Sequence, residues 1–378
     1  MAFIGFGKIN KNLIPLVLGC IFCFLNRLVN QIDYPELFGN IILTNMFISG
    51  ANLFLIIPCI ISIIRSKKGK ANNNKKENAN NLNKIEYIYQ DDKNNVKYRG
   101  LFILLIALVL FVNYNMLVYT FKISINTWIL FILFASIFYY LFFKIKLYRH
   151  HYLSIIIILI LGIVIDLILD NYNIPVNDYL LVLVSIVRII LLSFVYILFK
   201  YTIEKKCVSL YTIGFCNGVL ILIFSIIFAI LDNYFFGMYN YELFFNNFNF
   251  NKLLIILGLR STQLGIYTTT NIINKNDSPC HVFIVYVFGQ FGYYFNDFSS
   301  PVRTSMVILC LIFILFFSLV FNEIIELNFL RLSFNTKRNI VLRAENETNN
   351  TLKRENFSSS IDSESLIELP DNEIEQYN

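Results

Sequence analysis

The sequence predicts an all-α polytopic membrane protein whose ten transmembrane helices form a 5+5 inverted repeat. Of the 378 residues, 57% are hydrophobic and 15% are charged, whereas soluble proteins average about 45–50% apolar and about 25% charged residues. The apolar residues are grouped into blocks of about 20, the length that a helix needs to cross about 30 Å of hydrocarbon. The basic residues gather in alternate loops, as in proteins that cross a membrane many times.

We predict two halves of five spans each, at residues 12–169 and 179–321. The first span is long, contains Arg27 and lacks a small-residue cleavage site, so we expect it to be retained rather than removed as a signal peptide. In chain order the predicted spans are Asn12–Ile32, Ile41–Ile64, Tyr98–Tyr119, Ile125–Phe143, Tyr152–Leu169, Tyr179–Tyr201, Leu210–Leu231, Leu253–Ile273, Val282–Tyr294 and Val302–Phe321.

The distribution of basic residues predicts the orientation. When a basic residue at the end of a span is counted with the adjacent loop, 25 of the 31 lysines and arginines fall on one side of this arrangement, three fall on the other side, and three lie deeper within spans. Because positive charge favours the cytosolic side, we predict that both termini are cytosolic. Residues 1–11, the loop 66–97 and the tail 322–378 would then lie in the cytosol. The loop contains the stretch KKGKANNNKKENANNLNK and the tail is polar, so we expect both to be largely disordered.

Weak internal similarity supports two halves of opposite orientation. The stretch SIFYYLFFKIKLYRHHYLSIIII resembles QFGYYFNDFSSPVRTSMVILCL when the two Tyr-Tyr pairs are aligned. An odd number of spans in each half inverts the second half relative to the first. Inverted repeats with a central binding site are a recurrent architecture of transporters.

The eighth span carries the strongest candidate for a binding face. A charge deep in hydrocarbon costs about 2.5–3.5 kcal/mol on insertion scales, so an intramembrane arginine usually faces a cavity or a partner. Arg260, Gln263, Tyr267 and the pair Thr270–Asn271 share one face of a helix. We expect this face to line the solute pathway. The alternative is a polar face that packs against other helices, with Arg260 satisfied by carbonyl groups.

Other polar residues within spans are candidates for solute contact. Arg188 lies near the middle of the sixth span, with an ion pair or a carbonyl clamp as the alternative role. Arg27 lies nearer the end of the first span, where a long side chain can reach the interface. Asn26, Asn113 and Asn115 are candidates as well, although interhelical hydrogen bonds of about 0.6 kcal/mol are an alternative. If the three arginines face inward, the cavity has positive potential and an anionic solute fits it.

Asp166 is the only acidic residue inside a predicted span. A buried carboxyl group has a raised pKa and can exchange a proton near neutral pH, which would suit proton coupling. Asp170 is one turn away, so a place at the membrane interface is the alternative for Asp166.

The C-terminal tail contains a possible sorting signal. Asp362, Leu366 and Ile367 match the acidic dileucine pattern that sorting adaptors read.

We expect no metal, no cofactor and no enzymatic activity. Of the seven cysteines, only Cys20 and Cys23 have CxxC spacing, and they fall inside an apolar block, where cysteine usually behaves as a small hydrophobic residue. The adjacent His150 and His151 are the only cluster of this kind, and they sit in a basic turn with no carboxylate near them in the sequence. An interfacial basic loop is therefore the preferred interpretation. No GxxxxGK[ST] loop is present, so pumping driven by ATP is disfavoured.

Three stretches resemble the drug/metabolite transporter superfamily, and within it the branch of chloroquine-resistance-transporter-like and solute-carrier-35-like proteins. They are LGCIFCFLNRLVNQ, KIKLYRHHYLSIIIILILGIVID and SIVRIILLSFVYILFKYTIEKKCVSLYTIGFCNGVLIL. The resemblance covers residues 12–321 and implies a 5+5 inverted repeat with a central cavity that works by alternating access.

The expected function is that of a secondary transporter that moves a small organic, anionic solute across an endomembrane. The resemblance implies a nucleotide sugar, organic phosphate, amino acid or peptide, with the vacuole, lysosome or Golgi as the membrane and the plasma membrane left open. The expected partners are the solute, the lipid bilayer and sorting adaptors, with no nucleic acid. A membrane-embedded transferase and a non-transporting receptor or scaffold are the alternatives.

Overall fold

The computed structural model describes twelve stretches of the chain. They are residues 4–6, 13–30, 50, 52–61, 64, 98–120, 126–145, 147–169, 179–232, 234, 250–294 and 300–327. Within these stretches, the side chains of residues 4–6, 13, 27–30, 117–120, 250–260 and 326–327 lie outside the description.

The described chain is overwhelmingly helical, and its helices coincide with the predicted spans. The apolar blocks form helices because each supplies about 20 residues whose backbone groups must be paired within the helix when lipid surrounds it. The helices are α1 (Leu13–Asn30), α6 (Arg99–Thr120), α7 (Leu130–Phe143), α8 (Arg149–Ile168), α9 (Tyr179–Lys206), α10 (Leu210–Leu231), α12 (Phe250–Asn276), α13 (Val282–Tyr294) and α14 (Pro301–Phe321), with the short 3-10 helices η2 (Thr127–Ile129) and η5 (Pro279–His281) before α7 and α13.

Five of these helices are long and apolar enough to cross a membrane, namely α6, α8, α9, α10 and α14. The segments Ile14–Asn26 and Thr127–Phe143 are apolar but shorter. The expectation of a helical membrane protein is confirmed. The number of ten spans stays a prediction, because most of the predicted second span lies outside the described residues and α13 has only 13 residues.

Two short strands depart from the all-helical prediction. β1 (Ile4–Phe6) and β2 (Ile325–Leu327) pair in a two-stranded sheet. Each has three residues with apolar side chains at its ends, which suits strand pairing but is far too short a signal to stand out in this sequence. β1 and residues 326–327 belong to one unit, and the described helices belong to a second unit within residues 8–325.

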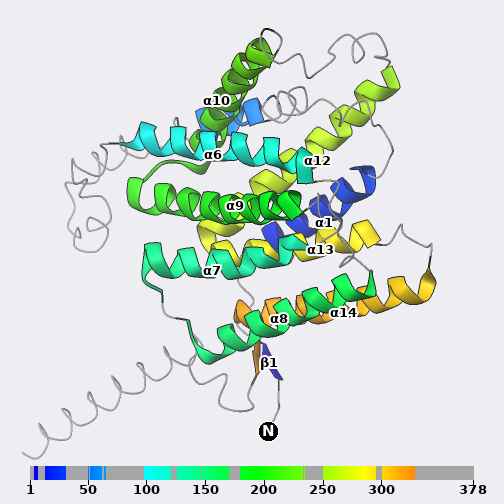
Figure 1. The fold of residues 1–378 in the computed structure, drawn as a ribbon. Helices are drawn as coiled ribbons and strands as arrows, with labels where there is room; N and C mark the ends of the chain where they lie inside the picture. The colour runs from blue at the N-terminus through cyan, green and yellow to red at the C-terminus, as the bar shows by residue number, and fades with distance from the viewer. Residues whose placement is uncertain are drawn as a thin grey trace, which may run out of the picture. The chain divides into compact units, whose positions relative to one another are not determined.

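Within the helical unit, two helices each pack between a pair of others. α1 contacts α12 and α13, whereas α9 contacts α6 and α7 (Figure 1). A third contact joins α8 to α14, which lie side by side in Figure 1. These five helix contacts each join residues before position 170 to residues after position 178.

Side-chain contacts fix the relative directions of these helices. Asn26 Nδ2 donates to Thr262 Oγ1 at 2.9 Å and Gly19 lies against Thr269, so α1 and α12 are antiparallel. The ring of Phe199 contacts that of Tyr267, and Lys200 reaches Asp277 at the end of α12, so the C-terminal half of α9 packs against the C-terminal half of α12.

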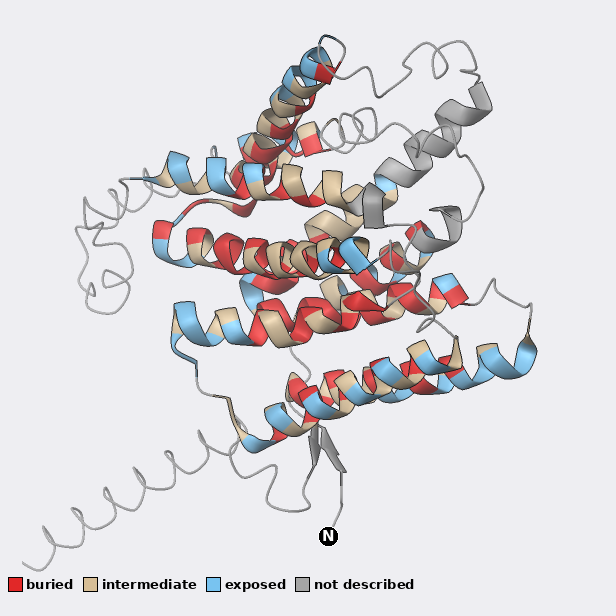
Figure 2. Cartoon of the chain, in the orientation of Figure 1, coloured by how far each residue is buried: buried red, intermediate tan, exposed pale blue. Residues whose placement is uncertain are grey.

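Burial follows the contacts between helices. The facing sides of α7, α9 and α13 are buried, whereas the outer sides of α6, α8 and α14 are exposed (Figure 2). The exposed residues of the outer sides include large apolar side chains such as Ile163 (62% exposed) and Val302 (73% exposed). Apolar side chains facing outward over whole helices are what a lipid environment requires.

Candidate functional site

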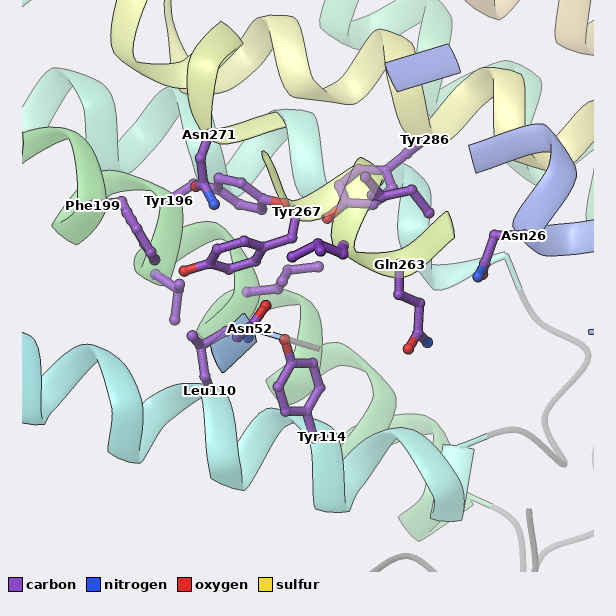
Figure 3. A pocket seen from close by; sticks show the side chains of 14 residues that line it. Asn26, Asn52, Leu110, Tyr114, Tyr196, Phe199, Gln263, Tyr267, Asn271 and Tyr286 are labelled. Carbon is purple, nitrogen blue, oxygen red and sulfur yellow. Dashed lines mark hydrogen bonds between the residues drawn. The ribbon is translucent and has the colours of Figure 1, made fainter. Parts of the chain in front are cut away.

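A cavity of about 190 Å³ lies among helices from both predicted halves of the chain (Figure 3). Its wall combines aromatic and aliphatic side chains with carboxamides, a composition typical of sites for small molecules. The lining residues are Asn26, Asn52, Leu110, Tyr114, Leu192, Val195, Tyr196, Phe199, Gln263, Leu264, Ile266, Tyr267, Asn271 and Tyr286. All of them are uncharged.

α12 contributes the largest share of this wall. Gln263, Tyr267 and Asn271 follow one another at intervals of four residues, so they share one face of the helix, and all three line the cavity. Figure 3 shows Gln263 and Asn26 at the opposite end of the cavity from Asn271 and Phe199. The structure therefore brings together three of the predicted contact residues, namely Gln263, Tyr267 and Asn26.

The threonines of α12 bond within their own helix. The hydroxyl groups of Thr268, Thr269 and Thr270 donate to the carbonyl groups of the preceding turn at 2.7–2.8 Å. A threonine that bonds in this way is satisfied in hydrocarbon without any partner on another helix. The polarity of the Thr268–Thr270 run therefore demands no solute.

Three polar atoms of the cavity wall have no hydrogen-bond partner among the described residues. They are Asn52 Nδ2, Tyr267 Oη and Asn271 Oδ1, and the side chains of Asn52 and Asn271 are 3% and 2% exposed. The carboxamides of Asn271 and of the buried Asn217 lie beside Tyr267 Oη without meeting it in hydrogen-bond geometry. Buried polar groups are normally paired, so this set on the cavity wall is available to bond a molecule in the cavity.

Tyr196 of α9 lines the cavity and bonds through its hydroxyl group to residues of two other helices. Tyr196 Oη donates to Thr270 Oγ1 at 3.3 Å and lies 3.0 Å from Tyr286 Oη. The ring of Tyr196 also meets Phe131 edge to face, with the ring centroids 5.7 Å apart. Tyr196 thus joins α9 to α12, α13 and α7 at one point.

One turn along α9, a buried lysine fastens this helix to the end of α12. Lys200 Nζ donates to the backbone carbonyl oxygens of Asn274 at 3.0 Å and Asp277 at 2.9 Å, and it pairs with Glu204 at 2.9 Å. Asn274 Nδ2 donates back to the carbonyl oxygen of Tyr196 at 2.8 Å. The last carbonyl groups of a helix lack partners within the helix and carry partial negative charge, so an ammonium group satisfies both needs. We call Lys200, Glu204, Asn274 and Asp277 the Lys200 junction.

The other predicted contact residues of the third and sixth spans lie outside the cavity lining. Asn113 is buried and its Nδ2 donates to the carbonyl oxygen of Arg188 at 2.7 Å, which ties α6 to α9. Asn115 Nδ2 donates to the carbonyl oxygen of Phe111 in its own helix at 2.9 Å. Arg188 is half-buried on α9 and does not line the cavity. These contacts match the alternative of helix-to-helix bonding for Asn113.

Asp166 accepts two hydrogen bonds from one residue. The backbone N–H of Asn126 donates to Asp166 Oδ1 at 3.1 Å, and the side chain of Asn126 donates to the same oxygen at 2.8 Å. Trp128 Nε1 and Tyr294 Oη both donate to Asn126 Oδ1. Asp166 thereby holds the start of η2 and, through Asn126, the end of α13.

The structure places a carboxylate beside the histidine pair, although none lies near the pair in the sequence. Glu323, which follows α14, places its Oε1 3.3 Å from His150 Nε2. His150, His151 and Glu323 offer ligand atoms within 4.8 Å of one another and could hold a metal ion. The pairing escaped the sequence because it depends on the contact between α8 and α14. His151 Nδ1 already accepts a hydrogen bond from the backbone N–H of Tyr148 at 3.0 Å, so this nitrogen serves the start of α8.

Several predicted residues fall outside the description. Arg260 lies in α12 and Arg27 in α1, but their side chains are among those that are not described. The proposed sorting residues Asp362, Leu366 and Ile367 lie outside the described residues altogether. The site described here therefore does not include them.

All seven cysteines are free thiols. Burial raises the pKa of the Cys280 thiol in η5 to about 12, so this group is a neutral thiol at physiological pH rather than a nucleophile.

The sequence missed Tyr114, Tyr196 and Tyr286, which face the cavity from α6, α9 and α13. Each lies within an apolar stretch, where the sequence alone predicts that an aromatic residue packs in the hydrophobic core. A signal was present only for Tyr196, because Lys200 follows it four residues later on the same face of the helix.

Neither a protein-family model nor a curated protein matches this sequence.

Proposed function

We propose that this chain is a secondary transporter that carries a small organic solute through the central cavity by alternating access. The single observation that carries the proposal is a cavity with a mixed aromatic and carboxamide wall, enclosed by helices from both halves of the chain. A site near the middle of the membrane, between two halves, is the usual place for the solute of a carrier built from inverted repeats.

The contacts between helices support two related halves of five spans. If α1, α6, α7 and α8 of the first half correspond to α9, α12, α13 and α14 of the second half, the exchange turns the α1–α12 contact into the α9–α6 contact. It also turns the α1–α13 contact into the α9–α7 contact and leaves α8–α14 unchanged. All of these contacts are present among the described helices. A two-fold pseudosymmetry of this kind is what an inverted repeat produces.

Helix directions support the alternation of ten spans. The antiparallel pair α1 and α12 corresponds to the first and eighth predicted spans. Odd and even spans must run in opposite directions, as this pair does. The pairing of β1 with β2 brings the segments before the first helix and after the last helix together, in agreement with two termini on one side.

Two features of the site bear on the charge of the solute. The described lining favours an uncharged solute, whereas the expected anionic class depends on Arg260, one turn before Gln263 in α12. Arg260→Ala separates these possibilities, because the loss of uptake for anions alone would assign the arginine to the pathway.

Uptake by purified protein in liposomes tests the proposal. The panel covers nucleotide sugars, organic phosphates, amino acids, peptides, organic cations and neutral heterocycles, with and without a pH gradient. Saturable uptake of one class supports a carrier. Binding of a solute to the detergent-solubilised protein, without uptake of that solute, would contradict the carrier and favour a receptor.

A further inference from the structure

We infer that the cavity recognises an uncharged, flat heterocycle that carries a hydrogen-bond donor and acceptor on one edge, as in an amide-type ring. This inference rests on the proposed function and specifies the solute class for the same site.

The first argument is the set of unpaired polar atoms. Asn52 Nδ2 can only donate, Asn271 Oδ1 can only accept, and Tyr267 Oη can do either. If both carboxamides are turned, the two atoms exchange roles and the pair still requires both a donor and an acceptor, whereas turning one alone would leave two groups of the same kind beside Tyr267 Oη. A solute with only acceptors, such as a carboxylate or phosphate, would leave an acceptor on the wall unpaired.

The second argument is charge. The fourteen lining residues include no lysine, arginine, histidine, aspartate or glutamate. An ion moved from water into such a wall loses its hydration and gains no opposite charge, which is far more costly than the transfer of a neutral group with matched hydrogen bonds. Arg260 does not alter this at the Asn271 end of the cavity, because eleven residues of α12 separate their Cα atoms by about 16 Å.

The third argument is shape. Rings of Tyr114, Tyr196, Phe199, Tyr267 and Tyr286 all face the cavity, and Figure 3 shows Tyr267 between the carboxamides of Asn52 and Asn271. Aromatic faces attract other flat rings by stacking or edge-to-face contact. An apolar cavity of about 150 Å³ holds one benzene molecule, so a cavity of about 190 Å³ is of the size for one substituted ring.

Matched probe pairs test the inference on the unaltered protein. Nicotinamide is compared with nicotinate, which has the same ring but a carboxylate, and uracil with N,N′-dimethyluracil, which lacks the donors. Binding to the detergent-solubilised chain and uptake into liposomes are both measured. We expect nicotinamide or uracil to bind at least about tenfold more tightly than its partner, since one unmatched hydrogen bond or charge accounts for such a factor.

Two variants locate the effect. Tyr267→Phe removes only the hydroxyl group and Asn271→Leu removes the carboxamide at similar size, and each should weaken binding of the neutral ring about tenfold. Tyr293→Phe removes a hydroxyl from an exposed residue of α13 and should leave binding unchanged.

The outcomes distinguish this inference from the proposed function. Uptake restricted to anions, or binding of none of the four rings, would overturn the inference while leaving the carrier to other solutes. Equal binding of both members of each pair would overturn it too. Tight binding of the neutral rings without uptake of either would support the inference and contradict the carrier.

Discussion

Two polar regions of α9 and α12 lie one helical turn apart and differ in every respect that matters for function. At the cavity, the lining side chains are uncharged, and Asn52, Tyr267 and Asn271 have polar atoms without a hydrogen-bond partner in the part of the chain that the structure describes. At the Lys200 junction, the ammonium group is charged and bonds to two carbonyl oxygens at 3.0 Å or less and to one carboxylate. Paired charge holds helices together, whereas unpaired neutral groups leave room for a solute. The Lys200 junction therefore fastens the two helices, whereas the cavity wall is where the proposed function places recognition of the solute.

The comparison also has a mechanical consequence. If the cavity is to open alternately toward each side of the membrane, helices that pack at one end must separate at some stage. The Lys200 junction lies just beyond the cavity along both helices, so it is the contact that such a movement would have to loosen on that side.

The largest effect is expected from the loss of the junction itself. Lys200→Met removes the ammonium group and leaves buried carbonyl groups at the end of α12 without a donor, which should lower the stability by about 3 kcal/mol. Thermal unfolding in detergent measures this loss. Lys205→Met, at an exposed position of the same helix, is the control. Equal stability of the two variants would remove the distinction between the two regions.

A close approach of two helices gives the next effect. A Cβ added at Gly265 would lie 2.7 Å from the ring of Phe22, so Gly265→Ala forces α1 away from α12 and should cost about 2 kcal/mol. Gly100→Ala provides the control, because a Cβ there meets nothing within 4 Å. An unchanged melting temperature for Gly265→Ala would mean that the α1–α12 contact beside the cavity is looser than the structure has it.

Substitutions of Asp166 test whether this hydrogen-bonded carboxylate stabilises the structure or takes part in proton coupling. Asp166→Ala removes the acceptor of two hydrogen bonds and should lower stability by about 1.5 kcal/mol. Asp166→Asn keeps an acceptor oxygen, so we expect it to fold and to keep the response of uptake to a pH gradient. If Asp166→Asn folds but loses that response, the carboxylate exchanges a proton during transport.

The smallest effect concerns a single bond between helices. Asn113→Leu removes the bond to the Arg188 carbonyl group and should lower stability by about 0.6 kcal/mol. Asn115→Leu removes a bond within one helix and should have a smaller effect on stability. A clear loss of solute binding in Asn113→Leu, at normal stability, would instead extend the site toward α6.

The helices could be predicted from the sequence because lipid leaves few choices. A block of about 20 apolar residues must satisfy its backbone internally, so α8, α10 and α14 begin and end within three residues of the predicted spans. The face of α12 that contains Gln263, Tyr267 and Asn271 was predictable for a related reason, since polar residues at helical spacing stand out in an apolar background.

The residues that the sequence missed depend on contacts between distant segments. Lys200 lies at the end of an apolar block, where the sequence alone suggests an ordinary basic residue at the edge of a loop. In the structure it packs against the end of α12 and is only 3% exposed. Glu323 meets His150 only because α14 packs on α8. Tyrosines such as Tyr286 carry a hydroxyl on an apolar ring, so their sequence context cannot tell a cavity wall from a core.

The most direct test of the central claim is exchange across the liposome membrane. Liposomes that contain the protein are loaded with the unlabelled solute found by the uptake panel, and the entry of labelled solute is followed. A carrier with one alternately exposed cavity should take up label faster when preloaded. This stimulation should persist in Lys205→Met and fall about tenfold in Asn271→Leu, which loses one hydrogen bond to the solute. Entry that is indifferent to preloading, or stimulation that is undiminished in Asn271→Leu, would contradict the assignment of this cavity as the site of transport.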